Sequence, residues 1–242
     1  MPPGSLQKSE KCMPTEQEVY NQHAEEYERL IQREDHHNHI LRAVEQICPL
    51  KGLDVIDIGA GTGRVTRILA PHVATIKAYD SSAHMLSKAQ SCLHAMGLSN
   101  WQAAVADHRQ IPVPDASADI VISGWSFCYL AVWGGEKWHE ELEAGYREVL
   151  RVLRPGGFFI LLETLGTGEE SPKPPEHLAG YYAWLTEKGF QSTWIRTDYR
   201  FSSLAEAAEL SKFFFGEKLG REVARKKWII LPECTGVWWQ KK

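Results

Sequence analysis

The 242-residue sequence lacks the cysteine patterns that mark disulfide-rich or zinc-binding proteins. Its five cysteines are widely separated and form no CxxC pair: Cys12, Cys48, Cys92, Cys128 and Cys234. An odd number of scattered thiols is typical of a reducing compartment. We therefore predict free thiols and no metal site.

Long hydrophobic runs and long basic runs are also missing. No apolar run approaches the roughly 20 residues of a membrane span, and the first residues lack the apolar segment of a secretory signal. The formal net charge is −4, and Lys and Arg do not cluster into a surface for a phosphate backbone. We expect a cytoplasmic protein that binds neither membranes nor nucleic acids, and the oligomeric state stays open.

What the sequence does contain is a regular alternation of strand and helix patterns. Short β-branched segments at LDVIDIG, TIKAYD, WQAAVAD, ADIVISGW and FFILLE predict strands, the last beginning after Pro155-Gly156-Gly157. The intervening segments are amphipathic, as in the stripe of Met85, Leu86, Ala89, Leu93 and Met96. This alternation predicts a doubly wound α/β fold with a mostly parallel sheet covered on both faces.

The remaining segments predict one domain at residues 15–242 after a flexible tail at residues 1–14. Within residues 15–50, Tyr20, Ala24, Tyr27 and Ile31 share one helical face, which predicts an N-terminal helix. Residues 51–163 form the expected ligand-binding core. Residues 164–242 add a helix from about Leu204 to Phe215, and the strands WIRTDYRF and WIILPECTGVWW, expected as an antiparallel pair at the sheet edge.

A glycine-rich turn, Asp57-Ile58-Gly59-Ala60-Gly61-Thr62-Gly63, follows the first strand. Glycines let a ligand approach the backbone, and such a turn lies where open α/β sheets bind ligands, facing helix amides. A dinucleotide fingerprint would place its third glycine at Arg64. Asp57 would repel a pyrophosphate but attract the ammonium of an amino-acid moiety.

Asp80 closes the second strand and strengthens this interpretation. A carboxylate there can accept hydrogen bonds from both ribose hydroxyls of an adenosine. Met85 can add an apolar contact. The turn, Asp57 and Asp80 together predict a binding site for a small molecule that contains an adenosine and an ammonium group.

VIDIGAGTGR, AYDSS, VADHRQIPVPDASADIVISGW and REVLRVLRPGGFFILLE resemble the class I methyltransferases, particularly the small-molecule branch called methyltransferase type 11. The likeness covers about residues 19–163. It implies a Rossmann-like, seven-stranded sheet, an N-terminal helical lid and S-adenosyl-L-methionine as cofactor. It also implies an enzyme that methylates a small molecule, with residues 164–242 shaping the acceptor side.

The resemblance also assigns cofactor contacts by position. The glycine turn holds the methionyl end, Asp80 the ribose, and Asp107 with the backbone of His108 the adenine, while Ser123 and Gly124 lie beside the methyl group. Tyr20 and Tyr27 resemble aromatic residues that close over the cofactor. The full expected set is Tyr20, Tyr27, Asp57, Gly59, Ala60, Gly61, Gly63, Asp80, Ser81, Met85, Asp107, His108, Ser123 and Gly124.

The residues that bind the acceptor are harder to identify from the sequence. Methyl transfer from a sulfonium needs mainly alignment, exclusion of water and removal of a proton, so it requires few dedicated catalytic residues. Glu163 ends the fifth strand and is the candidate base. Trp125 and Tyr129 are candidate walls of the acceptor site, and Asp35 and His36 can reach it from a lid. Surface or packing roles remain open for all five.

Two features depart from the family, and two other functions remain open. SFCYLAVWGGEKWHEE replaces a histidine-containing stretch after the fourth strand, so no base can be transferred from there. The region from Thr164 onward matches no acceptor class. We expect transfer to O or N of a small molecule; the alternatives are a dinucleotide-dependent oxidoreductase and a non-catalytic cofactor-binding subunit.

Overall fold

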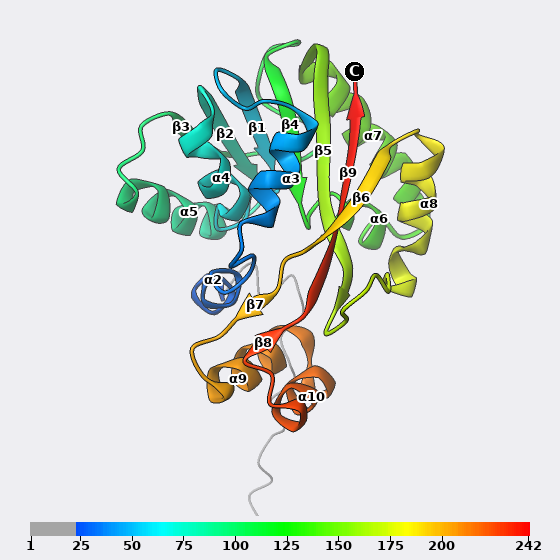
Figure 1. The fold of residues 1–242 in the computed structure, drawn as a ribbon. Helices are drawn as coiled ribbons and strands as arrows, with labels where there is room; N and C mark the ends of the chain where they lie inside the picture. The colour runs from blue at the N-terminus through cyan, green and yellow to red at the C-terminus, as the bar shows by residue number, and fades with distance from the viewer. Residues whose placement is uncertain (1–22) are drawn as a thin grey trace, which may run out of the picture.

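The computed structural model describes residues 23–242, so the predicted tail and Tyr20 lie outside the described residues. Seven strands form one sheet in the order β3-β2-β1-β4-β5-β9-β6 (Figure 1). They are β1 (Asp54–Ile58), β2 (Thr75–Asp80), β3 (Trp101–Val105), β4 (Ala118–Gly124), β5 (Leu153–Thr167), β6 (Gln191–Arg196) and β9 (Glu233–Lys241). Strands β1 to β5 pair in parallel, and β9 is antiparallel to both β5 and β6.

This arrangement confirms the predicted fold class, a mostly parallel doubly wound sheet with antiparallel pairing at one edge. The antiparallel strand β9 is next to the edge, and β6 is the edge strand itself. The main helices of the described residues are α2 (Ala24–Ile31), α3 (His39–Ile47), α4 (Arg64–Leu69), α5 (Ala83–Ala95), α6 (Tyr129–Val132), α7 (Trp138–Val152), α8 (Ala179–Glu187), α9 (Leu204–Phe215) and α10 (Glu217–Lys226).

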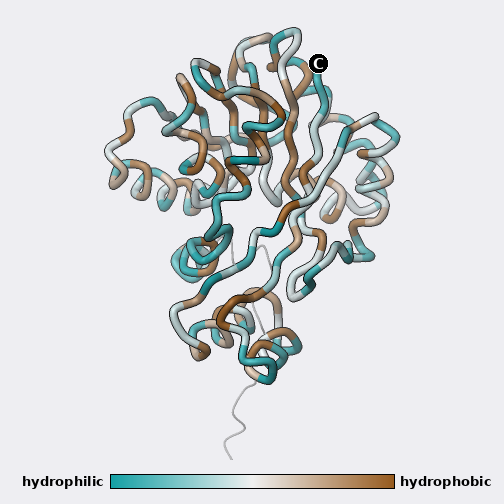
Figure 2. Tube along the Cα trace, viewed as in Figure 1, coloured by the Kyte–Doolittle hydropathy of each residue, from teal (hydrophilic) through white to brown (hydrophobic). Residues whose placement is uncertain are grey.

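Hydrophobic side chains fill both faces of the sheet, as a doubly wound fold requires. On one face, Val149 of α7 and Leu185 of α8 pack with Leu161 of β5. On the other, Val44 of α3 and Leu69 of α4 pack against the sheet. Figure 2 shows the hydrophobic segments concentrated in the central strands between these helices. The sheet is therefore a rigid platform whose carboxyl ends can carry a site.

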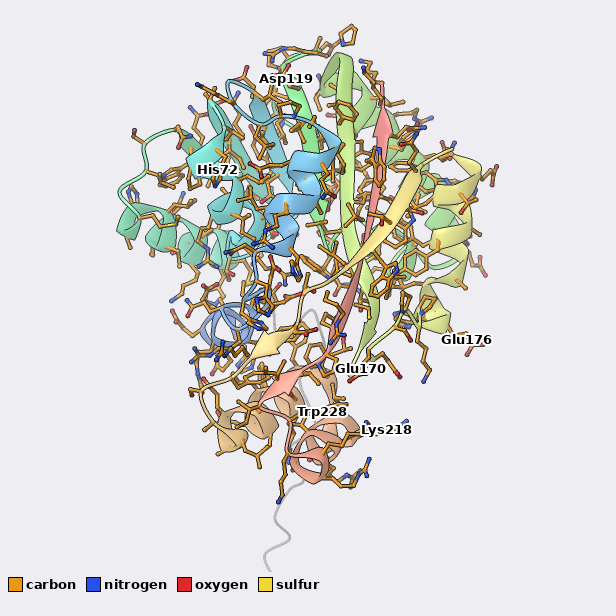
Figure 3. All side chains as sticks on the ribbon, viewed as in Figure 1. His72, Asp119, Glu170, Glu176, Lys218 and Trp228 are labelled. Carbon is orange, nitrogen blue, oxygen red and sulfur yellow. The ribbon has the colours of Figure 1, made fainter. Side chains whose placement is uncertain are left out.

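A third hydrophobic cluster lies beyond the carboxyl ends of the strands. It joins α9 and α10 to the short strands β7 (Tyr199–Arg200) and β8 (Ile230–Leu231), which form a separate two-stranded ladder. Figure 1 shows this part below the sheet, with α2 beside it. Figure 3 labels Lys218 and Trp228 there, and Asp119 at the opposite end of the molecule.

Ion pairs join helix α2 to the helices that cover the sheet and to the α9–α10 part below it. Arg67 of α4 pairs with Glu28 at 2.8 Å, and Lys88 of α5 pairs with Glu25 at 2.6 Å. On the other side Arg29 reaches Glu209 of α9 at 3.2 Å. The helix thus bridges helices α4 and α5 and the α9–α10 part.

Several boundaries differ from those predicted. β5 starts at Leu153, before the Pro-Gly-Gly segment, because Leu153 pairs with Ala118 of β4, and it runs on to Thr167 because β9 pairs with its later part. WIRTDYRF is divided between β6 and β7, and WIILPECTGVWW between β8 and β9. Met96, expected on the buried stripe, is 45% exposed because α5 ends at Ala95. Helix α10, at Glu217–Lys226, was not predicted from the sequence.

Within residues 23–242, no helix combines the length and apolar character needed to cross a membrane.

Candidate functional site

The glycine turn joins β1 to α4 and brings the backbone close to neighbouring elements. A Cβ added at Gly59 would lie 1.8 Å from Oγ of Ser126, so no larger residue fits there. Gly61 has a φ of 57°, and the nearest atom to its added Cβ is Cε of Met85 at 3.6 Å. The space over Gly61 is therefore open to a ligand, and its left-handed backbone favours glycine.

Asp80, at the end of β2, is held against this turn. Its Oδ2 accepts a hydrogen bond from the N–H of Gly61 at 2.8 Å, and its Oδ1 accepts one from the N–H of Ser82, also at 2.8 Å. Burial raises the pKa of Asp80 above its ordinary value. A carboxylate oxygen can accept a second hydrogen bond, so Asp80 keeps capacity for a ligand hydroxyl.

Asp57 is completely buried and only half satisfied. Its Oδ2 accepts a hydrogen bond from Oγ1 of Thr66 at 2.6 Å, whereas Oδ1 has no partner among the described residues. Burial raises the pKa of Asp57 to about 7. Because an unpartnered buried carboxylate oxygen is costly, a cationic donor here would be stabilising.

The residues after β3 form the opposite wall. The carboxylate of Asp107 accepts hydrogen bonds from the backbone N–H of Arg109 at 2.8 Å and from its Nε at 2.6 Å, which lower the pKa of Asp107. The Nε2 of His108 lies 3.1 Å from Oγ of Ser126. Burial lowers the pKa of His108 to about 4, so its ring is neutral near pH 7.

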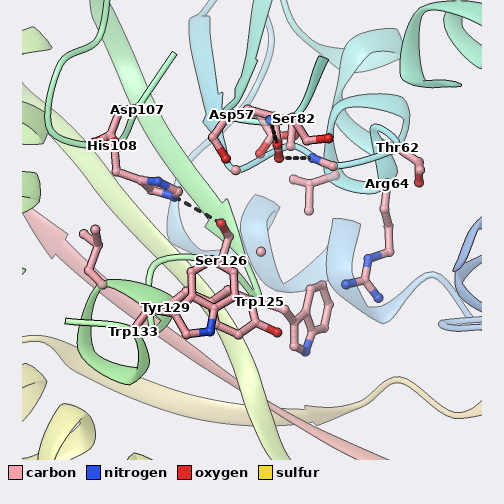
Figure 4. A pocket seen from close by; sticks show the side chains of 18 of the residues that line it. Asp57, Thr62, Arg64, Ser82, Asp107, His108, Trp125, Ser126, Tyr129 and Trp133 are labelled. Atoms are coloured by element: carbon pink, nitrogen blue, oxygen red, sulfur yellow. Dashed lines mark hydrogen bonds between the residues drawn. The ribbon is translucent and has the colours of Figure 1, made fainter. Parts of the chain in front are cut away.

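These groups line one cavity of about 630 Å³ at the carboxyl ends of the strands. Figure 4 shows Asp57 and Ser82 on one side, Asp107 and His108 on another, and Trp125 below. A cavity of this size suits a cofactor or a small ligand.

Arg64, the first residue of α4, joins the turn to the N-terminal segment. Its Cζ lies 3.5 Å from the centre of the Trp125 ring, and its guanidinium forms an ion pair with the buried carboxylate of Glu34. Glu34 also accepts a hydrogen bond from Oγ1 of Thr197 at 3.1 Å. The pairing compensates the charges of both Arg64 and Glu34.

A second cavity of about 770 Å³ shares its wall with the first. Tyr27, Ile31, Arg64, Trp125 and Tyr129 line both. Figure 3 labels Glu176, from the segment before α8, and Lys218 of α10, which both belong to its lining. The second cavity is therefore enclosed jointly by the sheet and the α9–α10 part.

Glu163 of β5 lies in the wall of this second cavity and is 1% exposed. Its Oε1 accepts hydrogen bonds from the N–H of Cys128 at 3.2 Å and from the hydroxyl of Tyr181 at 3.0 Å. Burial raises the pKa of Glu163 to about 7. A carboxylate in this state can exchange a proton near neutral pH.

Most of the predicted site residues converge. The expected residues that line the first cavity are Tyr27, Asp57, Gly59, Ala60, Gly61, Asp80, Ser81, Asp107, His108, Gly124, Trp125 and Tyr129. Glu163 lies in the adjoining cavity instead.

Apart from Tyr20, which the structure does not describe, the other expected residues do not line these cavities. Gly63 faces α5, where an added Cβ would lie 3.1 Å from Cβ of Ala89, and Met85 is buried behind Gly61. Ser123 is fully buried within β4. Asp35 accepts hydrogen bonds from the N–H groups of His39 and Ile40 at the start of α3, and His36 contacts a backbone carbonyl, so the structure gives both local roles.

Sequence reasoning missed some lining residues. Ser126 and Trp133 come from the segment after β4, where the family pattern is absent; Arg109 and Glu141 form a surface ion pair at the rim. Glu233, in the second cavity, carried a signal that was not used: it is the one acid in the otherwise uncharged stretch Trp228–Trp239. Among the described residues, no group of three or more His, Cys, Asp and Glu is placed to hold a metal.

Comparison with known proteins matches part of this chain to one family and to several relatives. Residues 56–161 match a family described as "Methyltransferase domain". An uncharacterized protein of Escherichia coli is 31% identical over 53% of this chain and 63% of its own length. The ubiquinone/menaquinone biosynthesis C-methyltransferase of Rubrivivax gelatinosus is 32% identical over 50% of this chain and 43% of its own. The chain therefore spans less than two thirds of the length of either relative.

Solved structures share the fold. A protein of Bacillus subtilis named YcgJ superimposes with a TM-score of 0.59 at 17% identity, over 86% of this chain and 98% of that one. A SAM-dependent methyltransferase from Aquifex aeolicus gives a TM-score of 0.55 at 18% identity, over 81% and 86% of the two chains. At these identities the likeness shows the architecture alone.

Proposed function

We propose that this chain is a class I methyltransferase of the type 11 branch, which uses S-adenosyl-L-methionine, and that it transfers a methyl group to O or N of a small molecule. The observation that carries the proposal is the joining of Asp80 to Gly61 beside the unpartnered oxygen of Asp57. One wall of the first cavity thus offers two carboxylates as hydrogen-bond acceptors, Asp80 for hydroxyls and Asp57 for an ammonium group. Gly61, which lies beside them, has no side chain to obstruct a ligand.

The residues of the first cavity suit the cofactor. Asp57 would hold its ammonium group, Asp80 the ribose hydroxyls, and Asp107 with the backbone of His108 the adenine. Ala60, Ser81 and Gly124 would supply close backbone approach. Bound there, S-adenosyl-L-methionine supplies an electrophilic methyl group on a positively charged sulfur.

We assign the acceptor to the second cavity, which adjoins the first at Trp125 and Tyr129. Strand pairing places Gly124 beside Leu162, one residue before Glu163. Glu163 is therefore positioned to align an acceptor hydroxyl or amine and to take its proton. Trp125, whose ring stacks on Arg64, separates the two cavities and would exclude water from the reacting atoms.

The N-terminal segment is the proposed lid. Tyr27 lines both cavities, and its ring centre lies 5.5 Å from that of Phe214. We further propose residues 51–163 as the cofactor-binding core and residues 164–242 as the acceptor-side additions. The free thiols of Cys48, Cys92, Cys128 and Cys234 suit a reducing compartment, such as the cytoplasm.

Titration calorimetry with S-adenosylhomocysteine and with NAD tests the cofactor. We expect the first to bind and NAD not to bind at millimolar concentration; the reverse would assign the cavity to a dinucleotide. Incubation of the isolated chain with labelled S-adenosyl-L-methionine and a metabolite extract then tests catalysis. A labelled small molecule supports an enzyme, whereas binding without any product would indicate a cofactor-binding subunit.

A further inference from the structure

The second cavity receives two buried carboxylates from neighbouring strands. Glu163 projects from β5, and Glu233 begins β9, which pairs with β5 through Thr167 and Glu233. Glu163 is 1% exposed and Glu233 is 2% exposed, and both belong to the lining of this cavity. We call Glu163 and Glu233 the carboxylate pair.

Glu233 is the less satisfied member of the pair. Its Oε1 accepts a hydrogen bond from Oγ1 of Thr164 at 2.9 Å, but its Oε2 has no hydrogen-bond partner among the described residues. Burial raises the pKa of Glu233 to about 7. Glu233 lines the cavity, and a buried carboxylate with an unpartnered oxygen is a group that a cationic donor would stabilise.

Two of the positively charged side chains that line the cavity already have carboxylate partners. Arg64 pairs with Glu34, and Lys173 pairs with Glu169 at 2.9 Å. Within residues 23–242, neither member of the carboxylate pair has an ion-pair partner. When the pair is ionised, the interior of the cavity therefore carries negative charge, which the nearby guanidinium of Arg64 offsets only in part, since it lowers the pKa of Glu233 while burial raises it.

Aromatic rings supply the rest of the wall. Tyr199 and Phe215 pack edge to face with their ring centres 5.8 Å apart, and Phe214 lies beside Tyr27. All four belong to the cavity lining. Aromatic faces attract organic cations and bury apolar groups, so these walls suit an amine with a hydrophobic body.

We propose that the acceptor is an organic amine with an aryl or alkyl body, and that Glu233 binds its ammonium group. The proposal rests on the proposed methyl transfer and specifies its substrate class. Glu233 is a specificity-determining residue that touches the acceptor. An alcohol would offer its Oε2 a single neutral donor, which binds more weakly than an ammonium group, and a carboxylate would be repelled.

The chemistry balances without a further reactant. The bound ammonium gives one proton to the carboxylate pair, which frees the nitrogen lone pair. That lone pair forms the new N–C bond to the methyl carbon as the C–S bond breaks, and the bonding electrons leave with sulfur as a neutral thioether. The product is an N-methylammonium ion, and the proton on the pair returns to solvent after release.

The test uses the full chain saturated with S-adenosylhomocysteine at pH 8. Calorimetry measures the binding of matched triplets, each an amine, an alcohol and a carboxylate on one carbon skeleton, for example 2-phenylethylamine, 2-phenylethanol and 3-phenylpropanoate, with alkyl analogues. We expect at least one amine to bind about tenfold more tightly than its alcohol and its carboxylate. Equal binding within every triplet, or preference for the carboxylates, would overturn the proposal.

Two variants test whether Glu233 causes the preference for amines. Glu233→Gln should reduce the amine-to-alcohol ratio to within about twofold while S-adenosylhomocysteine binds as in the parent. Glu187→Gln, the same change on an exposed residue of α8 that lines neither cavity, should keep the ratio. A ratio unchanged in Glu233→Gln would refute the role of Glu233. If the parent chain does not bind S-adenosylhomocysteine, the proposed function itself fails, which is a separate result from a missing amine preference.

Discussion

The backbone N–H of Gly61 donates a hydrogen bond to Oδ2 of Asp80 across 2.8 Å. This contact fixes the glycine turn after β1 to the end of β2, together with the hydrogen bond from the N–H of Ala60 to the carbonyl of Tyr79 at 2.9 Å. The carboxylate is thereby oriented before any ligand arrives, which lowers the ordering cost of binding.

Replacing Asp80 with alanine should weaken binding of S-adenosylhomocysteine by about 1.5–3 kcal/mol, because the ribose hydroxyls lose a charged acceptor and the turn loses its anchor. Calorimetry gives the dissociation constant. Asp115→Ala removes an exposed carboxylate whose partner is Arg151, and it should leave that constant unchanged. Equal affinities for Asp80→Ala and the parent would mean that the cofactor lies elsewhere.

Gly61→Ala and Gly52→Ala form a matched pair. Both glycines have positive φ, 57° and 83°, so each alanine should cost about 1–2 kcal/mol of backbone strain. Only Gly61 faces the cavity, whereas an added Cβ at Gly52 meets no atom within 4 Å. We expect cofactor affinity to fall at least about tenfold in Gly61→Ala alone. Urea unfolding checks the strain, and similar cofactor affinities in the two variants would contradict this placement.

Glu163→Gln should lower the turnover of the acceptor about 10²-fold or more, with little change in the Kd of S-adenosylhomocysteine, since a glutamine cannot take a proton. The base acts when ionised, and its pKa is raised to about 7, so kcat at saturating cofactor should rise as pH increases through about 7. Glu163→Gln should remove that rise. A retained rise would assign the proton transfer to another group.

The same raised pKa has a consequence for stability. The carboxyl of Glu163 binds a proton more tightly in the folded chain than in the unfolded one, where its value is 4.5. Its contribution is therefore fully present below about pH 4.5 and is lost as pH rises through about 7. Urea unfolding measured at several pH values between about 4.5 and 7 should show that the free energy of unfolding falls less with rising pH in Glu163→Gln than in the parent. Parallel curves would mean that Glu163 titrates normally.

Arg64→Met should destabilise the fold by about 3–5 kcal/mol, because it leaves the buried carboxylate of Glu34 without its cation. The double variant with Glu34→Gln should recover at least half of that loss. Lys173→Met disrupts an ion pair in which the lysine side chain is 74% exposed, and it should cost less than about 1 kcal/mol. A double variant as unstable as Arg64→Met would show that Arg64 acts through packing on Trp125 instead.

The parts of the fold set by local pattern were predictable. TIKAYD became β2 and the helix from Leu204 to Phe215 became α9 with the predicted ends, because Ser203 caps that helix through its side chain. The length of β5 was not predictable, since it depends on pairing with β9, about seventy residues later in the chain. The division of WIRTDYRF likewise depends on a distant contact, the hydrogen bond from the N–H of Thr197 to the carbonyl of Glu233.

The same distinction applies to the site. Asp57, Gly61 and Asp80 belong to one contiguous βαβ unit, so sequence spacing was enough to group them. Asp35 was predicted to reach the acceptor because it lies close in sequence to the expected lid. In the structure its carboxylate instead accepts hydrogen bonds from the first N–H groups of α3. Glu233 was overlooked because its partners, Thr164 and the second cavity, come from segments far from it in the chain.

The position of β9 also affects how the chain folds during synthesis. This strand comes last in the described sequence yet pairs on both sides, with β5 and with β6. Until it leaves the ribosome, the hydrogen-bonding edges of β5 and β6 face solvent, and such edges invite pairing between molecules. The strand also carries Glu233. A nascent chain would thus close its sheet and complete its second cavity in the same late step, so slowing translation upstream of Glu233 should prolong an aggregation-prone state.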